Sequence, residues 1–215
     1  MRVELIDKMG NDDTVASAAR VSFRKRASEY TEERNHRLIK YLAEHEHWTP
    51  FGSVQLQFRM KMPIFIARQY FRHNIGLVRN EASRRYLSDD PEFWAPKYWR
   101  YRPDNIKQGS SDEVISVLND GSNPYVTFQK ALKECENTYT LMIKSGVAPE
   151  QARAVLPQAM YTEFIETGSL YAYARICKER LHPDAQQEIQ EIAQQISDVC
   201  KDVAPVSWRY LGRQE

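Results

Sequence analysis

Residues 54–73 read VQLQFRMKMPIFIARQYFRH, and the pattern of this stretch changes once, at Pro63. From Val54 to Met60, apolar side chains alternate with polar ones, which is the period of a half-buried strand. Pro63 cannot donate a hydrogen bond to a sheet, so we expect the strand to end there. Residues Ile64 to His73 read as a helix. The stretch therefore predicts a strand that passes directly into a helix.

Helices are expected on both sides of this strand. Asp13 or Asp12 is the expected N-cap of a helix from Thr14 to Phe23, and Thr31 that of a second helix. Residues 89–112 are rich in Pro, Trp and Tyr, which predicts a long packed loop.

The second half of the chain reads as mostly helical from Tyr125 onward. Gly146 ends one expected helix, Pro149 begins the next, and Pro183 opens the last. The fold class predicted is α+β, with a small antiparallel sheet packed with helices and a helix-rich C-terminal half. We expect a single domain over residues 1–215.

The overall composition is that of a soluble globular protein. The chain has 215 residues, of which 42% are hydrophobic and 27% charged, and no apolar run is long enough to span a membrane. The first residues, MRVELIDKMGNDD, contain no apolar signal core. Three cysteines without paired spacing favour a reducing compartment and no zinc or other metal site. We expect a cytoplasmic location, or the host cytoplasm if the source is viral.

The segment from Arg68 to Arg85 concentrates positive charge. It holds five arginines, one histidine and one acid, although the net charge of the whole chain is only +1. A neutral protein with a local cationic segment is suited to a compact anionic ligand more than to a long nucleic acid. Arginine matches phosphate oxygens, Ser83 adds a hydroxyl, and Glu81 adds an acceptor. The alternative is a solvated basic face with ordinary ion pairs.

The order of residues in this segment resembles the signature of flavin-dependent thymidylate synthases, RHRxxSxNExSxRY. Arg72 and His73 begin it, and residues 80–86, NEASRRY, complete it. Four further blocks resemble those of the family in the same order: His47–Phe51, Pro63–Gln69, Ala152–Pro157, and Arg180 followed by Ala185–Ile189. Together the matches run from about residue 12 to residue 208, and their combination is far more specific than any one motif.

The signature also departs from the family pattern in several places. Asn74 stands where the family has a third arginine, and Leu77 stands near the place of the first serine. One extra residue, close to Arg79, lengthens the segment between His73 and Asn80. Gly52 follows the Thr-Pro-Phe block, where some members have Glu. These changes concern the flavin-side loop more than the nucleotide contacts.

The resemblance implies an enzyme that converts dUMP to dTMP by reductive methylation. It implies 5,10-methylenetetrahydrofolate as carbon donor, FAD reduced by NADPH as hydride donor, and no enzyme cysteine as nucleophile. Arg180 is implied to lie against the uracil edge, where a fixed guanidinium would stabilise negative charge on the ring.

The resemblance also implies the remaining site residues and the assembly. The dUMP site implied is Gln69, Arg72, Glu81, Ala82, Ser83, Arg84, Arg85, Arg153 and Arg180. The FAD site implied is Thr49, Arg72, His73, Asn74, Glu81, Ser169, Tyr171 and Arg175. A homotetramer is implied, with active sites between subunits and residues 81–84 contributed by a neighbour. No nucleic acid and no membrane is expected as a partner.

Several residues leave alternatives open. Arg180 could be an ordinary cation at the end of a helix. Ser83 is expected to donate or accept hydrogen bonds, since no base that would make it a nucleophile is evident. His73 is expected to face the flavin or to be structural. Cys177, in a helical stretch, reads as a small buried residue and not as a nucleophile.

Two rival functions remain at this level. One is a nucleic-acid-binding module that uses residues 68–85. The other is a degenerate relative of the synthases that retains only nucleotide binding, for which Asn74 and Leu77 are the best support. A bound flavin would argue against the first rival, and dTMP formation against the second.

Overall fold

The computed structural model describes residues 1–87, 89–103 and 109–212. The helices are α1 (Asp12–Arg20), α2 (Glu32–Glu44), α3 (Ile64–Tyr70), α4 (Pro124–Lys144), α5 (Pro149–Ala152), α6 (Leu170–Arg180), α7 (Gln187–Val203) and α8 (Pro205–Leu211). The strands are β1 (Arg2–Met9), β2 (Gln55–Pro63), β3 (Leu77–Glu81), β4 (Trp99–Arg100), β5 (Val114–Ile115) and β6 (Tyr161–Ser169). Short 3-10 turns are η1 (Val21–Phe23), η2 (Ala27–Glu29), η3 (Thr49–Ser53) and η4 (Arg153–Val155).

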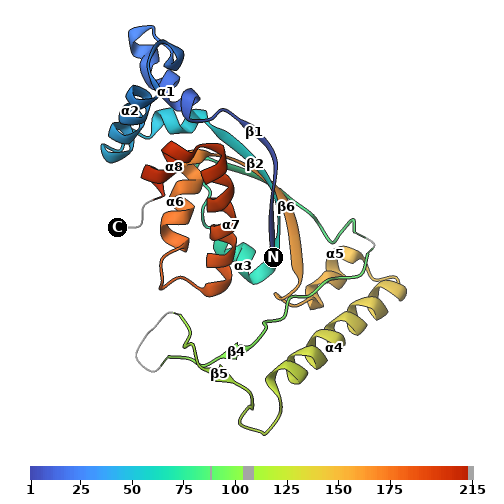
Figure 1. Ribbon diagram of the computed structural model, residues 1–215. Helices are drawn as coiled ribbons and strands as arrows, with labels where there is room; N and C mark the ends of the chain where they lie inside the picture. The colour runs from blue at the N-terminus through green and yellow to red at the C-terminus, as the bar shows by residue number, and fades with distance from the viewer. Residues whose placement is uncertain (88, 104–108, 213–215) are drawn as a thin grey trace. The chain divides into compact units, whose positions relative to one another are not determined.

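One four-stranded sheet carries the fold, with strand order β1-β2-β6-β3 (Figure 1). β4 and β5 form a separate antiparallel pair in which Trp99 is opposite Ile115. The small antiparallel sheet with many helices confirms the predicted α+β class. None of the described helices is long and apolar enough to cross a membrane.

The described chain divides into two compact units. The first unit comprises Met1–Met60, Tyr70–Asn80 and Phe164–Glu215, and the second comprises Lys61–Gln69 and Glu81–Glu163. The chain passes between the two units four times, within β2, α3, β3 and β6. The prediction of a single domain over residues 1–215 stays a prediction.

The core of the first unit is made by the inward residues of β2 and the apolar face of α7. Leu56, Phe58 and Met60 alternate along β2 and are fully buried, as the period of two predicts. Tyr173 of α6 packs its ring edge-on against Phe58, with the ring centroids 5.0 Å apart. The apolar face of α7 is buried as expected, including Ile192. The helices α6 and α7 contact one another, and α7 contacts β1.

The second unit is built around the long helix α4. Asn123 caps it by accepting hydrogen bonds from the main-chain N–H groups of Tyr125 and Val126, and Pro124 stands at its first turn. The helix ends at Lys144, just before Gly146, and α5 begins at Pro149, as predicted. The helices α4 and α5 pack together.

Several expected boundaries are wrong. The N-cap of α1 is Asn11 and not Asp12 or Asp13, because the Asp12 carboxylate instead accepts hydrogen bonds from Val206 and Ser207 at the start of α8. The helix α3 ends at Tyr70 instead of His73, and α7 begins at Gln187 instead of Pro183.

Of the strands in the described residues, only β2 was predicted. β1, β3 and β5 were not recognised, and β6 lies in the half that was expected to be mostly helical. The buried positions of β6 are Thr162, Phe164, Glu166 and Gly168. Two polar residues and a glycine at these positions hide the alternation of apolar and polar side chains from sequence reasoning. The expected loop 89–112 contains β4, and residues 104–108 of it lie outside the described residues.

Candidate active site

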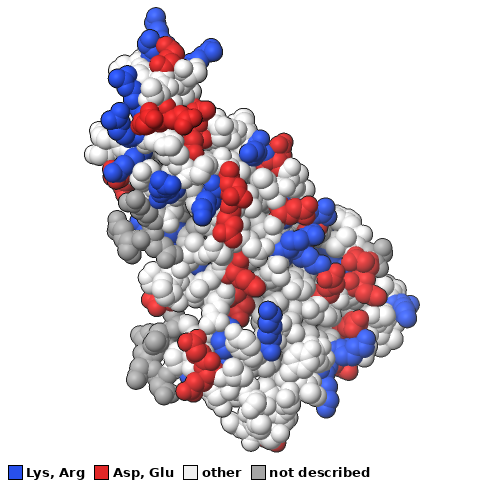
Figure 2. Space-filling view, viewed as in Figure 1, with Lys and Arg blue, Asp and Glu red and all other residues white. Residues whose placement is uncertain are grey.

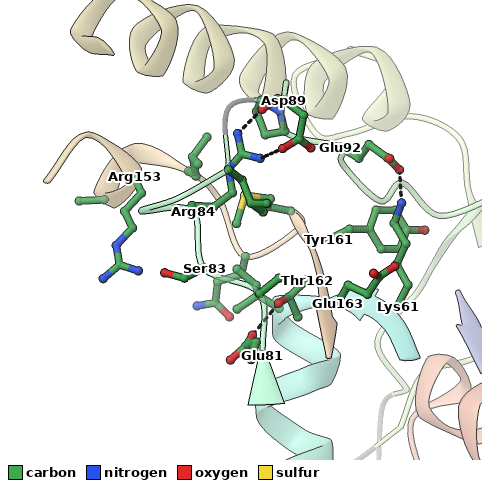
Figure 3. Close-up of a pocket in the computed structure, with 18 of the residues that line it drawn as sticks. Lys61, Glu81, Ser83, Arg84, Asp89, Glu92, Arg153, Tyr161, Thr162 and Glu163 are labelled. Carbon is green, nitrogen blue, oxygen red and sulfur yellow. Dashed lines mark hydrogen bonds and ion pairs between the residues drawn. The ribbon is translucent and has the colours of Figure 1, made fainter. Parts of the chain in front are cut away.

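The second unit holds a pocket of about 770 Å³ at the end of β3, here called the Ser83 pocket (Figure 3). Its volume is in the range of small-molecule sites. Of the residues predicted to bind dUMP, it is lined by Glu81, Ala82, Ser83, Arg84 and Arg153. Arg68, which was not predicted, also lines it and is exposed.

Hydrogen bonds hold the polar side chains at the C-terminal end of β3 in place. Thr162 of β6 donates from its hydroxyl to the Glu81 carboxylate at 2.6 Å. The Ser83 hydroxyl accepts from the Arg85 side chain at 3.2 Å, so Arg85 reaches the pocket through Ser83 without lining it. No histidine is among the described residues that line the pocket. The Ser83 hydroxyl thus already takes part in a hydrogen bond, and its role toward a substrate stays a prediction.

Arg84 has a structural task in this pocket. Its side chain is 9% exposed, and its guanidinium binds both the carboxylate and the main-chain carbonyl of Asp89. It also lies over the ring of Tyr139 at 5.7 Å. The carboxylate offsets much of its charge. Of the described residues that line the pocket, Arg68 and Arg153 are the exposed arginines, and both would be available to an anionic ligand.

The first unit holds a second, cationic pocket of about 350 Å³, here called the Arg180 pocket. It is lined by five predicted site residues: Arg72, His73, Asn74, Arg175 and Arg180. The turn after α3 forms one wall, and α6 forms the other. Gly76 in that turn has φ of +78°, and a Cβ built on it would lie 3.3 Å from Ala172 of α6. A glycine there allows the turn to approach the helix closely.

Arg180 and His73 meet across this pocket. The Arg180 Nε–H donates to His73 Nε2 at 2.8 Å, so the neutral ring carries its proton on Nδ1. Burial lowers the pKa of His73, the positive charge of Arg180 lowers it further, and Glu179 opposes both. His73 is therefore neutral at pH 7 and serves as an acceptor that orients Arg180.

Comparison with known proteins gives a consistent result. The model of the thymidylate synthase complementing protein family matches residues 4–206. The flavin-dependent thymidylate synthase of Thermus thermophilus is 36% identical over 206 residues, covering 96% of this chain and 73% of that protein. That of Thermosipho africanus is 38% identical over 210 residues, covering 94% and 87%.

The chain belongs to the flavin-dependent thymidylate synthase family. A crystal structure of the UMP/dUMP methylase PolB from Streptomyces cacaoi bound with 5-Br dUMP is also similar, with a TM-score of 0.85 and 28% identity. The match covers 97% of this chain and 93% of that one. The resemblance that the signature indicated is thereby confirmed.

Five residues that the family resemblance implied lie outside the linings of both pockets: Gln69, Arg85, Thr49, Ser169 and Tyr171. The Ser169 hydroxyl caps α6 by accepting from the Ala172 N–H at 3.2 Å. Tyr171 packs its ring against Trp48 with the centroids 5.9 Å apart, and Thr49 begins η3. Gln69 Oε1 is buried without a hydrogen-bond partner. The roles of all five stay predictions.

Sequence reasoning missed an ion pair between the partly buried Arg79 of β3 and the fully buried Glu166 of β6. Arg79 was noted only as lying near the extra residue. The signal for Glu166 was its place between Phe164 and Gly168, at an inward position of a strand, where an acid needs a partner. No group of acids, histidines and cysteines that would hold a metal occurs among the described residues.

Proposed function

We propose that this chain methylates dUMP to dTMP, with 5,10-methylenetetrahydrofolate as carbon donor and NADPH-reduced FAD as hydride donor. Membership of the family supports the reaction class. The observation that carries the proposal is the Arg180 pocket, where Arg180 is oriented by a neutral histidine beside Arg72 and Arg175.

The Arg180 pocket suits the anionic parts of a dinucleotide cofactor. Arg72 and Arg175 are exposed cations on its walls, and Asn74 adds an amide donor. These groups fit the diphosphate and ring carbonyls of FAD. When bound, the flavin supplies the hydride that completes the methyl group. The FAD site that we propose comprises Thr49, Arg72, His73, Asn74, Glu81, Ser169, Tyr171 and Arg175.

The chain's own contribution to the chemistry is electrostatic. Uracil C5 is a poor nucleophile until negative charge develops on the ring. A guanidinium at the uracil edge stabilises that charge, and Arg180 is held for this by its hydrogen bond to His73. We propose that Arg153, Ser83 and Arg85 hold the phosphate, because phosphate oxygens accept well from guanidinium and hydroxyl groups. Gln69, Arg72, Glu81, Ala82 and Arg84 complete the proposed dUMP site.

A cysteine nucleophile is not part of this proposal. Cys177 is 2% exposed, and its thiol lies 3.4 Å from the Ala193 carbonyl. Burial raises the pKa of the Cys177 thiol to about 12, and burial also raises that of Cys200. Since the thiolate is the nucleophilic form, both thiols are poor nucleophiles at pH 7.

The test is anaerobic turnover by the purified, flavin-loaded protein. We expect NADPH to bleach the flavin, and dTMP to form only when methylenetetrahydrofolate is present. Cys177→Ala should retain turnover, whereas Arg180→Ala should lose it. A protein that holds no flavin, or a loss of dTMP through a missing covalent adduct in Cys177→Ala, contradicts the proposal.

A second candidate substrate is UMP. Structures of PolB, described as a UMP/dUMP methylase, are similar both with 5-Br dUMP and with 5-Br UMP bound. The two nucleotides differ by the ribose 2′-hydroxyl, for which a carboxylate such as Glu81 would be an acceptor. Comparing kcat/KM for dUMP and UMP decides between them, and a higher value for UMP would replace dUMP as the proposed substrate.

Nucleic-acid binding by residues 68–85 is not favoured. Figure 2 shows Lys and Arg side chains intermixed with Asp and Glu over the face of the described residues that it presents. Within the cationic segment, Arg79 and Arg84 are already paired with Glu166 and Asp89. The remaining charge suits a small anion better than a long phosphate backbone.

A further inference from the structure

Glu166 is a carboxylate in the core of the first unit. It is fully buried, and it accepts a hydrogen bond from the Tyr70 hydroxyl at 2.6 Å and another from Arg79 Nε. Burial raises the pKa of the Glu166 carboxyl, an effect that the Tyr70 hydrogen bond and the Arg79 cation oppose. Burying a carboxylate costs solvation free energy that a well-packed apolar side chain would not cost. Its presence therefore needs a reason other than stability.

Arg79 connects this carboxylate to the turn that follows α3. Its Nη2 donates to the main-chain carbonyl of His73, while its Nε binds Glu166. The guanidinium also lies over the rings of Tyr70 and Phe71, at 5.3 and 5.0 Å. Two directed hydrogen bonds and two aromatic rings restrict the position and orientation of the Arg79 guanidinium. The side chain thus fixes the main chain at His73 relative to β6.

Two of the departures of this chain from the signature lie against residues of β6. The extra residue lies close to Arg79, and Arg79 faces Glu166. Leu77 stands near the place of a serine, and a Cβ on Gly168 would overlap its side chain. The segment that carries these departures is therefore packed against β6 and tied to it by an ion pair.

We propose that Arg79 and Glu166 are positioning residues of the active site: the pair fixes the His73 main chain and, through His73 Nε2, the guanidinium of Arg180. This inference rests on the proposed function, in which Arg180 acts on the uracil ring. The path has three links, from Glu166 to Arg79, from Arg79 to the His73 carbonyl, and from the His73 ring to Arg180 at 2.8 Å. Every link lies within the first unit.

The rival interpretation is a pair that only stabilises the fold. The two interpretations differ for the double variant Arg79→Gln/Glu166→Gln, which leaves no unpaired buried charge but removes the guanidinium that spans Glu166 and His73. If the pair only stabilises the fold, the double variant should regain turnover when it regains thermal stability. Positioning predicts that stability returns while turnover does not.

The experiment compares Arg79→Gln, Glu166→Gln, the double variant and Arg79→Lys in the flavin-loaded protein. We expect the double variant to recover most of the Tm lost by either single variant, with kcat still reduced about tenfold and KM for dUMP within about twofold. Arg79→Lys should recover stability but not kcat, since an ammonium group lacks the fork that makes both contacts. The control is Asp12→Asn, which weakens the cap of α8 in the same unit and should lower Tm without lowering kcat.

A second readout does not depend on turnover. The ring nitrogen shifts of His73, assigned with His73→Gln, report its contact with Arg180, and we expect them to change in the double variant but not in Asp12→Asn. Unchanged shifts, or kcat that returns together with Tm, would overturn the positioning role. If the wild-type protein binds flavin and makes no dTMP, the proposed function fails, and the His73 shifts still decide whether the pair positions the pocket.

Discussion

At the scale of single residues, the contact between His73 and Arg180 ties the active site to pH. His73 accepts from Arg180 only while its ring is neutral, and its pKa lies below the ordinary value of 6.5. The stabilisation that the neutral ring contributes is therefore complete above pH 6.5 and is lost as pH falls through the lower folded pKa. Protonation would place a second cation beside the guanidinium.

We expect kcat to show an acid limb that lies below pH 6.5 and belongs to His73. His73→Gln keeps an acceptor but cannot be protonated, so its kcat should stay near the wild-type value at high pH and lose this limb. The measurement is kcat from about pH 5 to about pH 8 with saturating substrates. An acid limb that persists unchanged in His73→Gln would show that another group titrates.

Replacing Arg180 with lysine tests the shape of the cation as well as its charge. Lysine keeps the charge but has no Nε–H donor for His73 and no planar fork. We expect kcat of Arg180→Lys to fall by about 10²-fold, the usual effect of losing one preorganised donor. Lys178→Met changes an exposed cation of the same helix outside the pocket and should leave kcat unchanged. Equal losses in the two variants would mean that general charge, and not position, matters.

At the scale of secondary-structure elements, Gly168 allows β3 and β6 to approach one another. A methyl group there would overlap Leu77 and come within 3.1 Å of the Tyr173 ring. Gly168→Ala should therefore lower the free energy of unfolding by about 1–3 kcal/mol, as overpacking does. Adding Leu77→Ala should recover part of this loss. Denaturant unfolding measures both, and a double variant with no recovery would contradict the assigned contact.

A strand could be predicted from the sequence when its buried side chains were apolar, and not when they were polar. β2 was predicted because its buried residues are apolar, and α4 and α5 were bounded by Pro and Gly as expected. β6 could not be predicted by the same rule, since Thr162, Glu166 and Gly168 occupy its inward positions. Thr162 and Glu166 are buried there because each bonds a polar group of another segment, Thr162 to Glu81 and Glu166 to Arg79. The sequence of one strand does not reveal these partners.

The candidate site was predictable where one segment supplies several residues and less so where distant segments meet. Ser83 with Glu81, and His73 with Asn74, came from the signature, and each pair lines one pocket. Arg180 could be assigned only through the family resemblance, because nothing in its helix indicates that it meets His73. Arg79 and Glu166 were missed altogether, because they are 87 residues apart and neither segment indicates its partner.

At the scale of the whole molecule, the two pockets lie in different units of the chain. The Ser83 pocket belongs entirely to the second unit, and the Arg180 pocket entirely to the first. The proposed dUMP site draws residues from both linings, which fits the proposal that active sites form between the subunits of a homotetramer. The assembly itself stays a prediction, and light scattering of the purified protein measures it.

Complementation tests whether one active site uses two copies of the chain. If Ser83 comes from one subunit and Arg180 from its neighbour, Ser83→Ala and Arg180→Ala should each be strongly impaired alone. A co-expressed mixture in equal amounts should regain about one quarter of wild-type activity, because random pairing leaves that share of sites with both side chains. The matched control mixes Arg72→Ala with Arg180→Ala, which line the same pocket and should not complement. If the first mixture stays as inactive as this control, both side chains act within one subunit and the shared site is wrong.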